Sequence, residues 1–252
     1  SSDLTSRKNP LLQKIRQLSS GGRGVREKAG EHLGDGIKLL EEALKWDVPL
    51  TTVVVTPEVT PPVLPAGVRL VQVPRDVMET ISPMKTPQGA LFLAQLPSTT
   101  PPQRLEGNRY LVLDGVQDPG NVGTIWRSAD ALGADGLLLV NGCADPYSPK
   151  VVRATMGACF RLPVWETTVE ELEGLLKTSQ IPLYATALRE DTVDVRQADL
   201  GRAAVVIGSE GRGVSQALLE RAEQTVKIPM RERCESLNAA SAAVVVLWEM
   251  GK

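Results

Sequence analysis

The strongest constraint on the fold of this chain is a regular alternation of short apolar runs with helical segments after residue 109. Strands that alternate with helices in this way predict a parallel sheet covered by helices on both faces. With 252 residues, 42% of them hydrophobic, the chain can bury such a core. The expected strands are residues 110–113, 136–140, 162–165 and 182–186, and the expected helices are 120–132, 149–156 and 169–178.

The last quarter of the chain adds two strands that end in glycine-rich and polar loops. An apolar run at residues 203–207 enters the turn Gly208-Ser209-Glu210-Gly211-Arg212-Gly213, and a helix is expected at 214–224. A second apolar stretch, residues 226–228, stops at Pro229 and leads through a polar loop into a final segment rich in Ala and Val. Because ligands of open α/β sheets bind at the carboxyl ends of strands, we expect functional residues in these loops.

The first part of the chain predicts a smaller α/β unit. Leu11, Leu12, Ile15 and Leu18 recur at helical spacing and indicate a helix. No catalytic constellation is apparent in this region. Further helices are expected at residues 36–45 and 76–81, and strands at 51–56, 68–73 and 89–94.

A proline-rich stretch at residues 97–102 has the composition of a linker. It divides the two patterns described above. We therefore predict an N-terminal domain at 1–97, a linker at 98–108 and a C-terminal domain at 109–252.

The charge is unevenly distributed along the chain. The net charge is −2, which by itself argues mildly against a nucleic-acid partner. The first 28 positions, however, carry seven basic and two acidic residues. Such clustering could follow a phosphate backbone or could be a solvated helix face, and both interpretations remain open.

Several classes of protein are disfavoured by what the sequence lacks. The longest apolar run is shorter than the ~18 residues of a membrane span, and residues 1–10 have no apolar signal-peptide centre. We expect a soluble, cytoplasmic protein. Cys143, Cys159 and Cys234 lie far apart, which indicates neither disulfides nor a metal site. His32 is the single histidine, which argues against a Ser-His-Asp hydrolase and a zinc enzyme, and no metal is expected.

Two glycine-containing loops are candidates for binding. The turn at 208–213 lacks the order G-x-G-x-x-G and the P-loop ending, so nucleotide phosphate binding is not expected. The loop at 114–123 follows a strand and opens a helix. Asn121 at the cap of that helix and Arg127 two turns on could hold an anionic group. Alternatively, Asn121 is only a helix cap and Arg127 only a surface charge.

Three segments in the second half of the chain resemble the signature motifs of the SpoU/TrmH family of RNA ribose 2′-O-methyltransferases. They read DPGNVGTIWRSAD at 118–130, IGSEG at 207–211, and IPM at 228–230 with SLN at 236–238. The segment LTSRKNP at 4–10 and Pro87-Gln88-Gly89 are similar to the N-terminal substrate-binding domain of that family. The resemblance implies a SPOUT fold with a deep trefoil knot in the C-terminal domain, and an N-terminal module like that of a ribosomal protein.

The resemblance also implies an activity and its partners. We expect S-adenosylmethionine as cofactor, transfer of its methyl group to a ribose 2′-hydroxyl of structured RNA, 23S rRNA rather than tRNA, and a homodimer. Arg127 is the expected catalytic residue, with Asn121, Glu210, Ser236 and Asn238 around it. The expected cofactor contacts are Thr186, Ala187, Leu188, Ile207, Gly208, Glu210, Gly211, Ile228, Pro229, Met230, Ser236 and Leu237. The expected RNA contacts are Arg7, Lys8, Asn9, Arg16, Arg23 and Arg127.

Several alternatives stay open at this point. A guanidinium is always protonated in proteins, so an arginine such as Arg127 is better suited to clamp a phosphate than to act as a base. The proton then passes to water or to Glu210, although Glu210 could instead be a turn residue at a helix start. Rival functions are an RNA-binding protein of the same fold without catalysis, a tRNA ribose methyltransferase and a small-molecule methyltransferase. The complete motif set argues against the first, and the basic N-terminus argues against the last.

Overall fold

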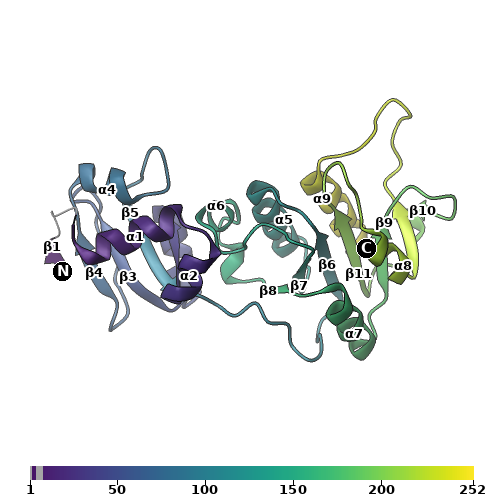
Figure 1. The fold of residues 1–252 in the computed structure, drawn as a ribbon, viewed down its shortest axis with the longest axis horizontal. Coiled ribbons are helices and arrows are strands. Elements are labelled where there is room, and N and C mark those ends of the chain that lie inside the picture. Colours follow the sequence, from purple (N-terminus) through teal and green to yellow (C-terminus); the bar gives the residue numbers. More distant parts are fainter. Residues whose placement is uncertain (1, 4–7) are drawn as a thin grey trace. The chain divides into compact units, whose positions relative to one another are not determined.

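A computed structural model describes residues 2–3 and 8–252 of the chain, which forms two compact units (Figure 1). The first comprises Ser1–Pro97 together with Asp145–Phe160, and the second comprises Ser98–Ala144 together with Arg161–Lys252. The chain therefore leaves the second unit after Ala144 and returns to it at Arg161. Among the described residues, no helix combines the length and the apolar character needed to cross a membrane.

The first unit is built on a mixed sheet with the order β1-β4-β3-β5-β2. β4 pairs in parallel with β1 and β3, whereas β5 is antiparallel to β3 and β2. The strands are β1 Ser2–Asp3, β2 Glu31–Asp35, β3 Leu50–Val55, β4 Arg69–Gln72 and β5 Ala90–Gln95. The helices are α1 Pro10–Ser20, α2 Arg23–Ala29, α3 Ile37–Lys45, α4 Arg75–Ile81 and α6 Pro149–Ala154, with a 3-10 turn η1 at Ala158–Phe160.

Helix α1 begins where the sequence provides its capping signals. The Asn9 side chain accepts a hydrogen bond from the Leu11 N–H at 2.9 Å, and Pro10 occupies the first helical position. Leu12, Ile15 and Leu18 lie on one face of the helix and are fully buried, as their spacing predicts. They pack with apolar side chains of β2, β3, β4, β5 and α4 to form the core of this unit.

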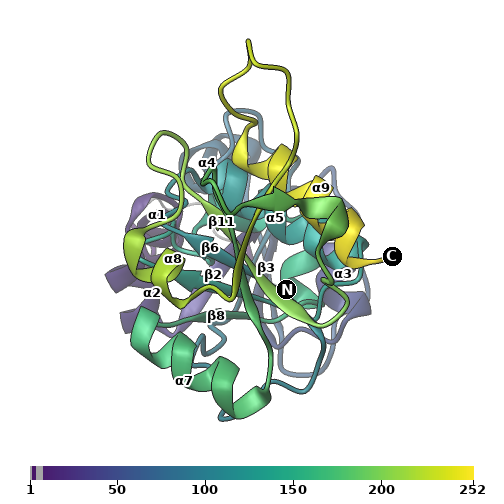
Figure 2. The ribbon, with the colours of Figure 1, turned by 90° about the vertical axis from the view of Figure 1, so that its right-hand side faces the viewer.

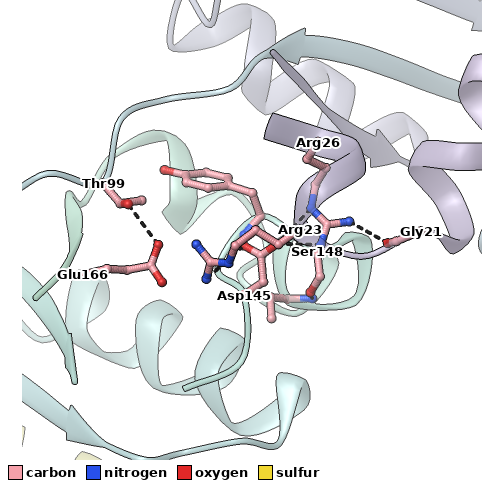
Figure 3. Close-up of polar contacts among 9 residues, drawn as sticks. Gly21, Arg23, Arg26, Thr99, Asp145, Ser148 and Glu166 are labelled. Carbon is pink, nitrogen blue, oxygen red and sulfur yellow. Dashed lines mark hydrogen bonds and ion pairs between the residues drawn. The ribbon is translucent and has the colours of Figure 1, made fainter. Parts of the chain in front are cut away.

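The segment Asp145–Phe160 belongs to the first unit through polar and aromatic contacts (Figure 3). The Arg26 guanidinium, 3% exposed, donates through Nε to Asp145 Oδ2 at 2.9 Å and through Nη1 to the Gly21 carbonyl at 3.0 Å. The His32 ring lies 5.0 Å from the Tyr147 ring. Breaking a buried ion pair by removing one partner costs about 3–5 kcal/mol, so Asp145 is needed to keep Arg26 buried. The sequence pattern had placed this segment in the C-terminal domain, because long-range ion pairs leave no local signal.

The second unit contains a sheet of seven strands, all parallel, in the order β10-β12-β9-β11-β6-β7-β8. This arrangement confirms the predicted α/β class with a parallel sheet. The strands are β6 Arg109–Asp114, β7 Gly136–Val140, β8 Val164–Glu166, β9 Leu183–Thr186, β10 Val193–Asp194, β11 Ala203–Gly208 and β12 Gln224–Lys227. The helices are α5 Pro119–Ala131, α7 Val169–Ser179, α8 Gln216–Arg221 and α9 Ala239–Met250, with a 3-10 turn η2 at Val195–Gln197.

Helices cover both faces of this sheet. α5 packs against α9 on one face, and α7 with α8 lies on the other (Figure 1). Side chains alternate between the faces along each strand, so Tyr110 and Val112 join the core beneath α7 and α8. The strands are buried on both sides, which explains why β6, β7 and β11 read as continuous apolar runs.

Residues 98–108, expected to form a linker, pack on the second unit. Thr99 accepts a backbone hydrogen bond from Glu166, and its hydroxyl donates to the Glu166 carboxylate at 2.9 Å (Figure 3). Leu105 is buried in the core, and its N–H donates to the Ser179 hydroxyl at 2.8 Å. The segment is thus held on the second unit by specific contacts, although its composition resembles that of a free linker.

The buried His32 makes the stability of the first unit dependent on pH. Burial, with a further contribution from the Arg26 charge, lowers the pKa of His32 from 6.5 to about 4, so the folded state holds a neutral imidazole. The unfolded state binds the extra proton between these values, so stability should fall as pH drops from 6.5 to about 4, by on the order of 3 kcal/mol. We expect the wild type to lose more stability over this range than His32→Phe, as measured by hydrogen exchange of β2 peptides in urea. Parallel pH profiles for the two proteins would contradict this assignment.

Candidate active site at the ends of strands β6 and β11

Strands β6 and β11 lie side by side at the point where the order of the parallel sheet reverses. The chain moves outward from β6 to β7 and β8, and then returns to build β9, β11 and β12 on the other side of β6. Asp114 at the end of β6 pairs in register with Gly208 at the end of β11. The crevice at such a reversal is where α/β sheets bind ligands. A cavity of about 490 Å³ lies here, and its lining includes Asp114, Gln117, Asn121, Asn141, Glu210 and Ser215.

The turn after β11 requires glycine where it folds back on the strand end. A Cβ on Gly208 would lie 2.3 Å from the Gly213 carbonyl carbon, which no side chain can tolerate. Gly211 and Gly213 adopt positive φ angles of 82° and 68°. The Gly213 N–H closes the turn on the Ser209 carbonyl at 2.9 Å. This tight path holds Glu210 at the mouth of the cavity.

Helix α5 is capped by Asp118. Its carboxylate accepts a hydrogen bond from the Asn121 N–H at 2.9 Å, and Pro119 follows at the first helical position. The prediction that Asn121 is the helix cap is therefore wrong. The Asn121 side chain lies in the first turn of α5, where it is free to contact other segments.

Glu210 joins three segments that are far apart in the sequence. Its Oε1 accepts a hydrogen bond from Asn238 Nδ2 at 2.8 Å and longer ones, at 3.4 Å, from Asn121 Nδ2 and the Ala239 N–H. Asn238 in turn caps helix α9 by accepting from the Ala240 N–H at 2.8 Å. The alternative that Glu210 sits at the start of the next helix is wrong for α8, which begins only at Gln216. Its carboxylate lies instead at the N-terminus of α9, where negative charge is favourable.

A second network of hydrogen bonds in the same crevice is centred on a buried carboxylate. Asp114, 4% exposed, accepts from Asn141 Nδ2 at 2.7 Å and from the Ser215 N–H at 2.6 Å. None of these three residues is among the predicted site residues. A signal was present, because Asp114 and Asn141 are the polar residues that end or directly follow two neighbouring apolar strands. Ser215 carried no such signal, since its position depends on the folding of the glycine-rich turn.

Cys143 lies next to the ends of β6 and β7 but does not provide a nucleophile. Its thiol donates to the Leu113 carbonyl at 3.2 Å, and burial raises its pKa to about 11. The thiol is therefore neutral at physiological pH, and the reactive thiolate form is not populated.

The remaining predicted catalytic residues are not brought into this network. Arg127 lies on α5 with an exposed side chain that has no hydrogen bond or ion pair within residues 8–252. Ser236 lies on the connection from β12 to α9, which is exposed from Pro229 to Asn238 and projects away from the sheet (Figure 2). The structure thus unites Asn121, Glu210 and Asn238, while Arg127 and Ser236 lie on adjoining segments.

The predicted cofactor contacts lie on the ends of β9, β11 and β12 and on the loops that follow them. Thr186 Oγ1 donates to the Val206 carbonyl at 2.9 Å, and the Ala187 N–H donates to the Val226 carbonyl at 3.0 Å, which ties these strand ends together. Ile207 is buried. Gly208 ends β11 and is partly exposed, and the other expected contacts lie on the loops and are partly or fully exposed: Leu188, Gly211, Ile228, Pro229, Met230 and Leu237.

The predicted RNA contacts in the first unit surround helices α1 and α2. Lys8 and Arg23 are exposed and Arg16 is partly exposed, while Asn9 uses its side-chain oxygen as the α1 cap. Arg23 also lies 3.9 Å from Asp145. Arg7 lies outside the described residues.

Comparison with known proteins identifies the family. Residues 108–248, which contain the whole of this crevice, match the SpoU rRNA methylase family. The chain belongs to this family. Residues 9–91 match a second family, the MRM3-like substrate binding domain. The resemblance noted in the sequence is therefore confirmed over most of both units.

This SpoU family member matches several relatives over nearly its whole length. It is 30% identical over 248 residues to the 23S rRNA (guanosine(2553)-2′-O)-methyltransferase RlmP of Bacillus subtilis, covering 98% of both chains. It is 31% identical to the 23S rRNA (uridine(2479)-2′-O)-methyltransferase of Streptomyces viridochromogenes, covering 98% and 90%. The crystal structure of an AdoMet-bound rRNA methyltransferase from Sinorhizobium meliloti superposes with a TM-score of 0.86 at 31% identity, covering 98% and 96%.

The hydrogen bonds of Glu210 to Asn238 and Ala239, here called the Glu210 junction, should stabilise the first turn of helix α9. Glu210→Ala removes the oxygen that accepts from Asn238 and Ala239, so the first turn of α9 should open more often. We expect a loss of about 1 kcal/mol in local stability, seen as roughly fivefold faster amide exchange at residues 239–242. Glu210→Gln retains an acceptor oxygen but loses the negative charge, so its exchange rate should lie between those of the wild type and Glu210→Ala. Equal rates in all three proteins would show that the junction does not hold the helix.

Proposed function

We propose that this protein transfers the methyl group of S-adenosylmethionine to the 2′-hydroxyl of a ribose in structured RNA, most readily 23S rRNA. The observation that carries the proposal is the meeting of Asn121, Glu210 and Asn238, one from each of the three family motifs, at the crevice between β6 and β11. If each of these side chains only stabilised its own loop, their meeting at one cavity at the strand ends would not be expected.

The residues expected to hold the cofactor fit its chemistry. Adenosine and a sulfonium carry no phosphate, so they call for backbone hydrogen-bonding groups and apolar walls rather than a P-loop. The ends of β9, β11 and β12 offer such groups beside Ile207 and Ile228, and Leu237 on the connection from β12 to α9 is a further apolar side chain for the wall. When bound, S-adenosylmethionine supplies a methyl group on a positively charged sulfur. The Glu210 carboxylate at the same turn is a favourable neighbour for that charge.

Ribosomal RNA is better supported than tRNA as the proposed substrate, because relatives that match the chain over nearly its full length are named as 23S rRNA methyltransferases. The first unit supports an RNA substrate, since it matches a substrate-binding domain and carries the basic N-terminal segment. An inactive RNA-binding protein is disfavoured, since the five motif residues are all present. The three cysteines are free thiols, which fits the reducing cytoplasm where we expect the protein to act.

In the proposed reaction the ribose oxygen attacks the methyl carbon while the carbon–sulfur bond breaks and the hydroxyl proton leaves. Asn121, Asn238 and Glu210 position the hydroxyl, and holding the reactants in line supplies much of the acceleration. Glu210 Oε2 accepts no hydrogen bond from the described residues, so it can take the proton directly or through water. The Arg127 guanidinium clamps the phosphate next to the ribose.

The same proposal includes a trefoil knot and a homodimer. In the proposed knot, the connection from β12 to α9 passes through a loop of the chain, so that Ile228 and Leu237 close over the cofactor. A second copy of the chain covers α9, on which the apolar side chains of Val244 and Trp248 are exposed at adjacent turns. Aromatic residues are enriched in the cores of protein–protein interfaces, so the exposed tryptophan on this helix supports the proposed contact.

The catalytic assignment predicts the effect of removing Arg127. The Arg127→Ala variant should transfer methyl groups from labelled S-adenosylmethionine to unmodified rRNA at least about 100-fold more slowly, because the phosphate loses its clamp. Its cofactor Kd, measured by calorimetry, should stay within about twofold of the wild type. Arg104→Ala changes another exposed arginine of the same unit and should leave both values unchanged. A tRNA pool assayed in parallel tests the substrate, and near-normal turnover by Arg127→Ala would refute the assignment.

The dimer assignment predicts the effect of a charge on α9. Trp248→Glu should convert a sedimenting dimer into a monomer, because a carboxylate would be desolvated at the interface core. Val63→Glu changes a side chain that is 95% exposed and should leave the dimer intact. A monomeric wild type, or a Trp248→Glu variant that sediments as a dimer, would remove the support for this interface.

A further inference from the structure

A buried carboxylate fixes the orientation of the Asn141 side chain. Asp114 accepts from Asn141 Nδ2 through Oδ1 at 2.7 Å, while its Oδ2 accepts from the Ser215 N–H at 2.6 Å. An ionised carboxylate only accepts hydrogen bonds, so the amide of Asn141 must turn its NH₂ group toward Asp114. The Ser215 Oγ, 3.5 Å from Nδ2, is placed to accept the second N–H. The usual ambiguity between the two amide orientations is thereby removed.

The Asn141 Oδ1 atom consequently faces away from Asp114. Because the amide cannot turn over, the group at this place is always a hydrogen-bond acceptor. No described residue donates a hydrogen bond to it. Asn141 is exposed and lines the cavity of about 490 Å³, together with Asn121 and Glu210. An occupant of this cavity can therefore donate to Asn141 without displacing any contact within the protein.

We propose that this cavity receives the base of the acceptor nucleotide and that Asn141 Oδ1 accepts a hydrogen bond from an N–H group of its Watson–Crick edge. The inference rests on the proposed function, since the same cavity is bordered by the residues that position the ribose. Its volume lies within the range of about 300–1,000 Å³ typical of sites for molecules of nucleoside size. Gln117, an exposed side chain of the lining with no partner among the described residues, offers a second donor and acceptor. Asp114 is a positioning residue that acts through Asn141.

This arrangement restricts the substrate to a nucleotide whose base is not paired. The edge that donates to Asn141 is the edge used in a Watson–Crick pair, so the nucleotide must lie in a loop or be extruded from a helix. The bases differ in the order of donors and acceptors along this edge. A fixed acceptor therefore favours some bases over others.

An asparagine at position 141 could be needed only for its backbone conformation, and a variant can separate that need from hydrogen bonding to the base. Asn141 has a φ of 60°, a left-handed conformation that asparagine tolerates and glycine adopts readily. Asn141→Gly therefore retains the backbone and removes only the amide. Gln180, with a φ of 56° at the end of α7 and outside the cavity, provides the matched control Gln180→Gly.

The test uses four RNAs that differ only in the base at the mapped methylation site. With the wild type, kcat/KM should differ at least about tenfold between the best and the worst base, the effect of leaving without a hydrogen bond a polar group that the bound base removes from water. Asn141→Gly should reduce this discrimination to within about threefold, with an unchanged cofactor Kd, whereas Gln180→Gly should retain it. Discrimination that is absent in the wild type or unaltered in Asn141→Gly would overturn the proposal. A wild type that methylates no RNA would instead refute the proposed function.

A second variant tests the positioning role of Asp114. In Asp114→Asn, the Ser215 N–H holds the new amide oxygen, so the new NH₂ group faces Asn141. Asn141 must then turn its own oxygen inward and present NH₂ to the cavity. The preferred base should change to one that offers an acceptor at that position, again with an unchanged cofactor Kd. An unchanged preference in an active Asp114→Asn variant would show that Asp114 does not orient Asn141.

Discussion

The pairing of β6 with β11 is the interaction on which the rest of the second unit depends. It joins a strand from the start of the unit to one from its last third, and its register sets Asp114 beside Gly208. Both strands are buried on their two faces, so a shift by one residue would exchange the side chains that meet α5 and α9 with those that meet α7 and α8. The register is thus fixed by the core, and the two loops that carry polar side chains emerge at one point.

Electrostatics then organises these loops. Two carboxylates act at different depths: Asp114 is buried and fully occupied by donors of the protein, whereas Glu210 is exposed and keeps one oxygen without a donor among the described residues. Asp114 fixes the side chain of Asn141 and the start of the segment at Ser215, whereas Glu210 connects the first turns of α5 and α9. A site with fixed side chains and one carboxylate oxygen without a donor is suited to a reaction in which the substrate must be oriented while it loses a proton.

Sequence patterns predicted most of the fold because the determining interactions are local or periodic. The apolar runs of β6, β7 and β11 and the helical spacing of Leu12, Ile15 and Leu18 lead directly to the observed elements. The predictions missed α2 and β2, where Arg26 and His32 are buried by contacts with residues more than a hundred positions away. Motif resemblance predicts that Asn121, Glu210 and Asn238 share one site; the structure brings their side chains together, and their catalytic role stays a prediction. The sequence gives no comparable motif for Asp114 and Asn141, because the hydrogen bond that joins them connects two strand ends that are far apart in the sequence.

The segment Asp145–Phe160 belongs to the first unit, although the residues before and after it belong to the second. This limits how the chain can be cut into domains and how its units can be exchanged in evolution. The chain passes between the units three times, after Pro97, after Ala144 and after Phe160. The first unit is therefore not a detachable module, since a fragment ending at Pro97 would lose Asp145 and leave the Arg26 guanidinium without its anionic partner. Exchange of the N-terminal unit between relatives would require this short internal segment to be exchanged with it, so the two parts are bound to change together.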